Sequence, residues 1–243
     1  MYGARGRIGL IVPSNNTVCE PEMAALCPPG VNTYSTRLLF DPKLEGLLGF
    51  SKDVDRASLE LSSENICQVI AFCCTMGSMI GGIHYDREII ARIEAIAKTP
   101  AITTTTAVKA ALDTLGVKKI AVATPYTQDI TQAELKALEL AGYRVTAIKG
   151  YHEHVAPGEC RNEMIGRLLP DVAFQLALEV NGKENEAIFI SCTNFRAIEI
   201  IEKLEDRTGK PVISSNQATS WYALRTLGLK DVIKGYGCLL ESH

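Results

Sequence analysis

Short apolar runs rich in Val and Ile recur along the whole chain, and segments with helical spacing of apolar residues separate them. Runs of this length and composition are typical of buried strands in parallel sheets, and helices between them are typical of βαβ units. The pattern therefore predicts an α/β fold. The expected strands are 7–12, 31–39, 69–73, 101–104, 119–123, 144–149, 187–191 and 212–215, and the expected helices are 52–66, 85–97, 106–115, 128–141, 162–181, 195–208 and 217–226.

The ends of the predicted strands repeat in the two halves of the chain. Such matches in one order indicate a duplication. We expect two lobes related by a pseudo-twofold axis, each a parallel sheet flanked by helices, with the active site in the cleft between them. The expected first lobe is 1–106 plus 216–243, and the second is 107–215. The matching segments are 11–17 with 122–127, 70–75 with 188–193, and 100–104 with 211–215.

Composition and charge narrow the functional classes. The chain has 243 residues, of which 47% are hydrophobic, so it can bury a large core. A net charge of −3 without a long Lys/Arg cluster argues against a nucleic-acid partner, and no apolar run approaches the roughly 18 residues of a membrane span. We expect a cytoplasmic protein that acts on a small molecule, with no nucleic-acid or membrane partner.

Two of the eight cysteines stand at matching positions of the repeat. Cys74 and Cys192 each follow an apolar strand and precede a Thr, and ligands of parallel sheets bind at that end of the strands. If the lobes face each other, the two thiols converge on one cleft, which suits chemistry on two faces of one carbon skeleton. We expect a helix after each cysteine, because a helix N-terminus lowers the pKa of a thiol and activates it as a nucleophile.

The other cysteines are expected to be reduced and to serve as small apolar side chains. Cys73 alternates with Cys74 along a strand and should therefore point the opposite way. No pair of cysteines has C-x-x-C spacing, and His152 and His154 lack further ligands nearby in the sequence, so we expect no metal.

Hydroxyl and amide side chains surround the predicted strand ends. Together with backbone N–H groups at the strand-to-helix turns, they can hold carboxylate oxygens without a cationic clamp, so we expect a small carboxylic acid as substrate. The stretch 77–82 is rich in glycine but matches no nucleotide-binding fingerprint, and we expect no nucleotide cofactor. The candidate binding residues of this kind include Ser14, Asn16, Thr75, Thr193 and Asn194.

Five motifs together resemble the aspartate/glutamate racemase superfamily. They are Val12-Pro13-Ser14-Asn15-Asn16-Thr17 with Glu20, Phe72-Cys73-Cys74-Thr75, Thr124-Pro125-Tyr126, Ser191-Cys192-Thr193 and Thr208-Gly209-Lys210-Pro211-Val212. The likeness runs over nearly the whole chain, and it is strongest to the maleate cis-trans isomerase and arylmalonate decarboxylase branch. Decarboxylases of this branch have glycine in place of the first cysteine, so the paired cysteines favour a maleate isomerase.

This resemblance implies a cofactor-independent isomerisation of maleate, or of a close analogue, to fumarate. Cys74 would add to the double bond to form a succinyl thioether, and Cys192 would serve as the opposing acid/base or guide the rotating carboxylate. Asn16 would bind a substrate carboxylate, Tyr126 would donate its hydroxyl to the substrate, and Asn162 would supply a second amide contact. The family's habit implies a homodimer.

Two other functions remain open at this point. One is racemisation or decarboxylation of a small dicarboxylate or amino acid through a planar carbanion, with the two cysteines as opposed bases. The other is non-catalytic carboxylate binding, since two-lobed α/β folds also serve as ligand receptors. Single residues also have simpler explanations: Asn16 suits a helix cap, Tyr126 a packed aromatic, and Arg37 a surface ion pair as well as a carboxylate partner.

Overall fold

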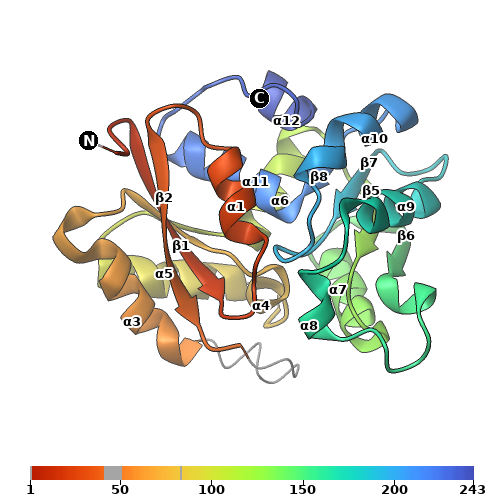
Figure 1. Ribbon diagram of the computed structural model, residues 1–243, viewed down its shortest axis with the longest axis horizontal. Helices are drawn as coiled ribbons and strands as arrows, with labels where there is room; N and C mark the ends of the chain where they lie inside the picture. Colours follow the sequence, from red (N-terminus) through yellow and green to blue (C-terminus); the bar gives the residue numbers. More distant parts are fainter. Residues whose placement is uncertain (1, 41–50, 83) are drawn as a thin grey trace.

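Two four-stranded parallel sheets form the framework of the protein (Figure 1). This computed structural model describes residues 2–40, 51–82 and 84–243. One sheet has the order β2-β1-β3-β4 and the other the order β6-β5-β7-β8, so both lobes have the same topology. The strands are β1 (Gly6–Pro13), β2 (Val31–Leu38), β3 (Val69–Phe72), β4 (Ala101–Thr103), β5 (Lys119–Thr124), β6 (Arg144–Gly150), β7 (Ala187–Ile190) and β8 (Val212–Ser214). The predicted two-lobed α/β fold is confirmed, and each predicted strand agrees with its observed counterpart within one residue at either end.

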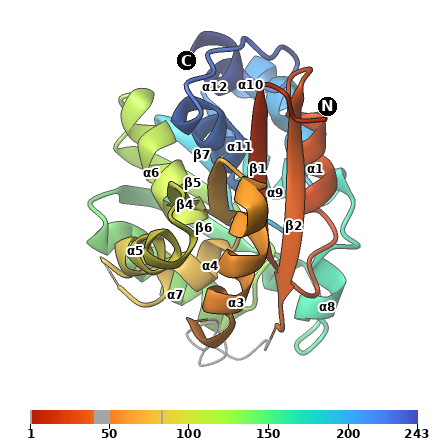
Figure 2. The same cartoon turned by 90° about the vertical axis from the view of Figure 1, so that its left-hand side faces the viewer.

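Helices flank both sheets (Figure 2). They are α1 (Cys19–Ala25), α3 (Ser51–Ser62), α4 (Thr75–Met79), α5 (Tyr85–Ala97), α6 (Thr104–Thr114), α7 (Gln128–Leu140), α8 (Asn162–Ile165), α9 (Pro170–Val180), α10 (Ile201–Thr208), α11 (Ser215–Thr226) and α12 (Cys238–Ser242). Short 3₁₀ turns add η1 (Ser63–Asn65), η2 (Tyr151–His154) and η3 (Ile198–Ile200).

Two predicted helices differ from the observed ones. The single helix expected over 162–181 is two helices, because Pro170 has no N–H and therefore starts α9 at its first position instead of continuing α8. The helix expected over 195–208 begins only at η3 and α10. The short helices α1, α4 and α12 were outside the predicted set, because five to seven residues carry too little periodicity to be recognised.

The central strands carry the candidate functional residues at their carboxyl ends. Strands β3, β5 and β7 are buried along almost their whole length, as expected when helices cover both faces of a parallel sheet. The chain leaves β1, β3, β5 and β7 through four turns, and these turns contain Asn16, Cys74, Tyr126 and Cys192. Because parallel strands end at a common edge, each lobe brings two of these turns together.

The chain passes between the lobes twice. Helix α6 links β4 of the first sheet to β5 of the second, and α11 follows β8 and returns to pack on α6, α1, β3 and β4. The lobes therefore share a helical contact that follows both sheets in sequence. The boundaries 1–106 plus 216–243 and 107–215 agree with the membership of the two sheets and otherwise stay a prediction.

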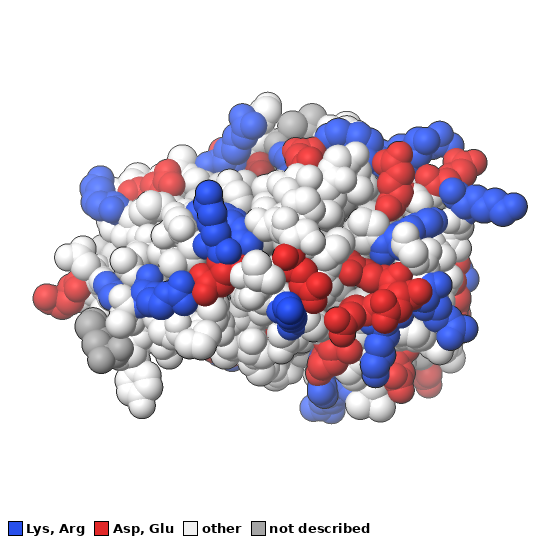
Figure 3. Space-filling model, turned by 90° about the horizontal axis from the view of Figure 1, so that it is seen from above, with Lys and Arg blue, Asp and Glu red and all other residues white. Residues whose placement is uncertain are grey.

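The surface carries mixed charge on the face shown in Figure 3, where Lys and Arg are interspersed with Asp and Glu. Across residues 2–40, 51–82 and 84–243, no helix has the length and hydropathy needed to cross a membrane.

The packing of β1 generates a stability prediction. Leu10 is fully buried in this central strand, so Leu10→Ala should lower the free energy of unfolding by about 2–5 kcal/mol through lost burial and the cavity left behind. Leu59 on α3 is 59% exposed. Leu59→Ala should change the stability by less than about 0.5 kcal/mol. Urea unfolding of both variants measures the difference, and equal losses would contradict the central position of β1.

Candidate active site

A cavity lies where the strand ends of the two lobes meet. Both lobes contribute to it, and its walls combine two thiols and several amide and hydroxyl groups with apolar side chains. Among the residues that the structure describes, the lining contains no Lys, Arg, Asp or Glu. It consists of Pro13, Asn15, Asn16, Phe40, Cys74, Thr75, Met76, Tyr126, Ile130, Asn162, Ile165, Cys192, Thr193 and Asn194.

Cys74 reaches the cavity from the first lobe. It has extended backbone angles and stands immediately before α4, and its Sγ accepts a hydrogen bond from the N–H of Gly77 at 3.3 Å. The Ser78 hydroxyl donates to the carbonyl of Cys74 at 2.8 Å and fixes the turn from below. The thiol is 8% exposed and therefore accessible only through the cavity.

Cys192 reaches the same cavity from the second lobe. Its backbone has a φ of 114°, outside the regions that non-glycine residues ordinarily adopt. The N–H of Asn194 donates to its Sγ at 3.3 Å, and its own N–H donates to Ser215 Oγ at 3.0 Å. We name residues 192–198 the Cys192 turn. The helix expected directly after Cys192 is absent, because the chain makes this irregular turn before η3 begins at Ile198.

The two thiols do not have the lowered pKa that the sequence led us to expect. Burial raises the pKa of Cys74 to about 12, and the Gly77 N–H offsets only part of that effect. Burial likewise raises the pKa of Cys192 to about 12, although hydrogen bonds from Tyr126 and the Asn194 N–H lower it. A helix terminus of five residues without a nearby cation cannot compensate for the removal of a thiolate from water.

Asn16 is fixed in the turn after β1. Its Oδ1 accepts from the N–H groups of Val18 and Cys19, and its Nδ2 donates to Thr193 Oγ1 in the other lobe at 3.0 Å. The capping interpretation is therefore correct for its oxygen, and it does not conflict with a place in the cavity wall. One proton of the Asn16 amide remains for a ligand.

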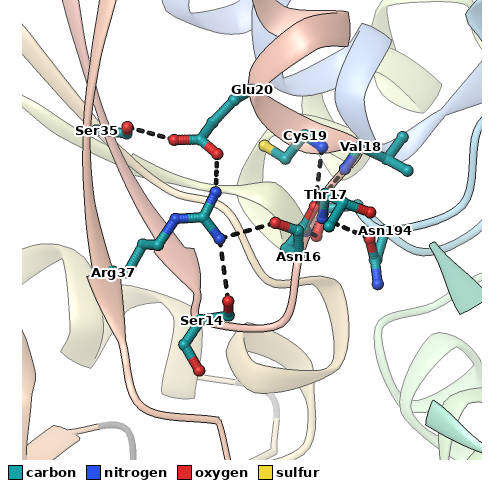
Figure 4. Close-up of polar contacts among 10 residues, drawn as sticks. Ser14, Asn16, Thr17, Val18, Cys19, Glu20, Ser35, Arg37 and Asn194 are labelled. Atoms are coloured by element: carbon teal, nitrogen blue, oxygen red, sulfur yellow. Dashed lines mark hydrogen bonds and ion pairs between the residues drawn. The ribbon is translucent and has the colours of Figure 1, made fainter. Parts of the chain in front are cut away.

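Arg37 supports this turn from behind (Figure 4). Its guanidinium pairs with Glu20 and donates to the carbonyls of Ser14 at 3.1 Å and Asn16 at 2.8 Å. The simpler interpretation of Arg37 as an ion-pair partner is thus the observed one, and it places the cation against the backbone of the turn.

Tyr126 stands beside Cys192 and interacts with its thiol. Burial, followed by the neighbouring Cys192, raises the pKa of the phenol well above its ordinary value, so the hydroxyl stays protonated and can donate. Two contacts hold its backbone: His152 Nδ1 lies 3.0 Å from the Tyr126 carbonyl, and Cys160 Sγ donates to the Pro125 carbonyl at 3.5 Å.

The remaining predicted binding residues occupy different positions. Thr75 is engaged with Ser215 Oγ at 2.9 Å, and Thr193 donates to the Cys73 carbonyl at 3.1 Å, so both hydroxyls already connect the lobes. Asn194 lines the cavity and accepts from the Thr17 N–H at 2.9 Å. Asn162 is half-buried at the start of α8 and also lines the cavity.

Ser14 is the predicted binding residue that the described lining does not include. Its side chain is exposed, and its hydroxyl accepts the Phe40 N–H at 3.0 Å. The turn after β1 directs Asn16 inward, and Ser14 lies two residues earlier with its hydroxyl engaged outside the lining.

Two buried carboxylates escaped the sequence analysis. Glu22 on α1 accepts from the N–H groups of Ala197 and Ile198 and from Asn216, and Glu134 on α7 accepts the Ser191 hydroxyl. Burial raises the pKa of each to about 7 against these hydrogen bonds. Their only signal in the sequence is an acidic residue on the apolar face of a helix.

Cys73 points away from the cavity, as its alternation along β3 predicts. It is fully buried in a separate apolar cluster with Cys19, Met23 and Leu10, on the opposite face of the first sheet from Cys74. All eight cysteines are free thiols.

Comparisons with known proteins agree with this site and fold. The sequence profile of the family described as arylmalonate decarboxylase matches residues 8–240. The chain belongs to this family. Its members include the predicted maleate isomerase and arylmalonate decarboxylase relatives, so the resemblance stated from the five motifs is confirmed.

Three relatives illustrate the likeness. A maleate isomerase from Geobacillus stearothermophilus is 28% identical over 250 residues, with 97% of each chain covered. An arylmalonate decarboxylase from Bordetella bronchiseptica is 28% identical over 245 residues, with 96% of each covered. The crystal structure of a maleate isomerase from Pseudomonas putida S16 with maleate has 27% identity and a TM-score of 0.88, with 97% of each chain covered. Identity alone does not separate the two activities.

The raised thiol pKa values generate a prediction about reactivity. Only the thiolate is alkylated, so iodoacetamide should modify Cys74 and Cys192 slowly at pH 7, with rates that rise about tenfold per pH unit up to pH 9. Peptide mass spectrometry follows each site separately, and free cysteine, whose pKa is about 8.5, serves as the reference that begins to level off. A plateau at Cys74 near pH 7 would contradict a thiol whose pKa is raised by burial.

Proposed function

We propose that the protein isomerises maleate, or a close maleate analogue, to fumarate through a covalent adduct on Cys74. The observation that carries the proposal is that Cys74 and Cys192 line one cavity from opposite lobes. A relative of the same length and fold was crystallised with maleate. The cavity also offers amide and hydroxyl groups suited to carboxylate oxygens.

The reaction requires a temporary loss of the double bond. The Cys74 thiolate forms a C–S bond to one alkene carbon, and the π electron pair moves to the neighbouring carbon and is delocalised into its carboxylate. Rotation about the resulting single bond exchanges the cis arrangement for the trans one. The electron pair then re-forms the double bond, the C–S bond breaks, and the thiolate and fumarate separate.

The raised pKa of Cys74 suits this addition in one respect. A thiolate of high pKa is scarce at neutral pH, but it is intrinsically more nucleophilic than one of low pKa. The Gly77 N–H supplies a donor to the sulfur when it carries charge. The enzyme thus combines a small thiolate population with high reactivity in a water-poor site.

Cys192 faces the developing carbanion from the other lobe in this proposal. Because burial keeps its pKa near 12, it is a thiol at neutral pH and can donate a proton to the intermediate and take it back. Tyr126 interacts with this sulfur and fixes its direction. Asn16, Asn162 and Asn194 supply amide groups for the substrate carboxylates. Thr75 and Thr193 hold the walls in place through their interlobe hydrogen bonds.

The first cysteine separates this function from decarboxylation. By the resemblance, arylmalonate decarboxylases carry glycine at the position of Cys74, whereas here a thiol with an N–H donor occupies it. Racemisation through a carbanion is the second candidate, because two thiols on opposite walls of one cavity also suit proton transfer on two faces. The site in either case serves a small carboxylate. A homodimer and a cytoplasmic location complete the proposal, in keeping with the family and with the composition.

Proton NMR of the protein with maleate in deuterated water tests the assignment. The proposal predicts fumarate from the native chain, a loss of at least about a thousandfold in kcat/KM for Cys74→Ala, and a loss of about 10²–10⁴ for Cys192→Ala. Cys73→Ala is the matched control, because it removes the neighbouring thiol from the other face of the strand, and its activity should stay within about threefold.

Three results of this experiment would separate the candidates. Absence of fumarate together with deuterium exchange at an α-carbon of an amino acid or dicarboxylate would favour the racemase. Carbon dioxide release from an arylmalonate would favour the decarboxylase. Full activity in both Cys74→Ala and Cys192→Ala would remove the cysteines from the mechanism.

A further inference from the structure

The Cys192 turn has a backbone conformation that local sequence does not favour. Among the described non-glycine residues with positive φ, Glu64, Asn65 and Lys98 lie between 51° and 55°, in the ordinary left-handed region, whereas Cys192 has a φ of 114°. Such a conformation persists only when surrounding contacts determine it. Contacts that hold the turn therefore also determine where the Cys192 thiol lies.

Most of these contacts come from the other lobe or from α11. On the near side, Ser215 accepts the Cys192 N–H, and Asn216 Nδ2 donates to the Thr193 carbonyl at 3.0 Å. On the far side, Glu22 Oε1 accepts the N–H of Ala197 at 2.8 Å and that of Ile198 at 3.2 Å. Both ends of the turn are thus fixed.

Glu22 joins the two ends. Its second oxygen accepts Asn216 Nδ2 at 2.7 Å, and Asn216 is the residue that holds the Thr193 carbonyl. Glu22 is 5% exposed on α1, a helix of the first lobe, while the Cys192 turn belongs to the second sheet. A buried carboxyl with three donors on a neighbouring lobe is a strong acceptor, and it is costly for the donors to lose it.

We propose that Glu22 is a positioning residue that reaches across the lobe interface and holds the Cys192 turn in the conformation that directs the Cys192 thiol into the cavity. Without this acceptor, Ala197 and Ile198 lose the partner of their N–H groups, and the turn relaxes toward a negative φ at Cys192. The consequence for catalysis rests on the proposed function, whereas the effect on the turn can be measured without substrate.

Two substitutions separate acceptor chemistry from volume. Glu22→Gln keeps an oxygen for the two N–H groups, and Glu22→Met keeps the length of the side chain but removes the acceptor. Glu202→Met on α10 is the matched control, because Glu202 is exposed and lies outside the Cys192 turn. Amide hydrogen exchange of the peptide 192–200 and the alkylation rate of Cys192 relative to Cys74 are both read on the free protein.

Glu22→Met should accelerate exchange of the peptide 192–200 about tenfold or more, because two hydrogen bonds to a charged acceptor are lost. It should also change the alkylation rate of Cys192 relative to Cys74 by about fivefold or more, since the sulfur leaves its present environment. In the turnover assay, kcat should fall about tenfold or more with a smaller change in KM. Glu22→Gln should restore most of each effect, and Glu202→Met should show none.

Unchanged exchange and unchanged Cys192 labelling in Glu22→Met would overturn the proposal. A uniform rise in exchange over the whole chain would also overturn it, because that pattern indicates general destabilisation. If Glu22→Met does not fold, Asn216→Ala removes the other end of the same contact and must accelerate exchange of the peptide 192–200 selectively. Absence of fumarate from the native chain would defeat the proposed function while these measurements still tested the position of the turn.

Discussion

Two buried thiols share one cavity because the carboxyl ends of two parallel sheets face each other. Neither sheet forms the site alone: the first lobe supplies Cys74 and Asn16, and the second supplies Tyr126 and Cys192. Burial in this interface determines the chemistry of the sulfurs, since it raises the pKa of both thiols and leaves N–H donors as their main stabilising partners. The reactivity of the site therefore depends on how accurately the two lobes meet.

Polar contacts between the lobes are concentrated around the cysteines. Thr75 contacts Ser215, Asn16 contacts Thr193, and Thr193 contacts the carbonyl of Cys73. Glu22 adds a buried acceptor for the far end of the Cys192 turn. Hydroxyl and amide groups that the sequence marked as substrate ligands thus have a second task, which is to fix the geometry of the cavity. A substrate carboxylate has to fit beside this network.

The sequence was sufficient for the sheets and for the pair of cysteines. Strands appear as apolar runs because both faces of a parallel sheet are covered, and the cysteines appear because their strand ends repeat. It was insufficient where the structure depends on contacts distant in sequence. Glu22 and the Cys192 turn lie 175 positions apart in their hydrogen bond, and no local pattern joins them. The turn after Cys192 was mistaken for a helix because its positive φ is stabilised by residues of the other lobe. The thiol pKa values were misjudged for a similar reason, since burial is a property of the assembled cavity.

The most direct test of the account is the identity of the covalent intermediate. Cys192→Ala protein is mixed with maleate, quenched with acid and digested, and the peptides are analysed by mass spectrometry. The account predicts one succinyl group on the peptide that contains Cys74, with Cys73 in the same peptide unmodified after fragmentation. Turnover by the native chain with no adduct on Cys74, or with the succinyl group on another cysteine, would contradict it.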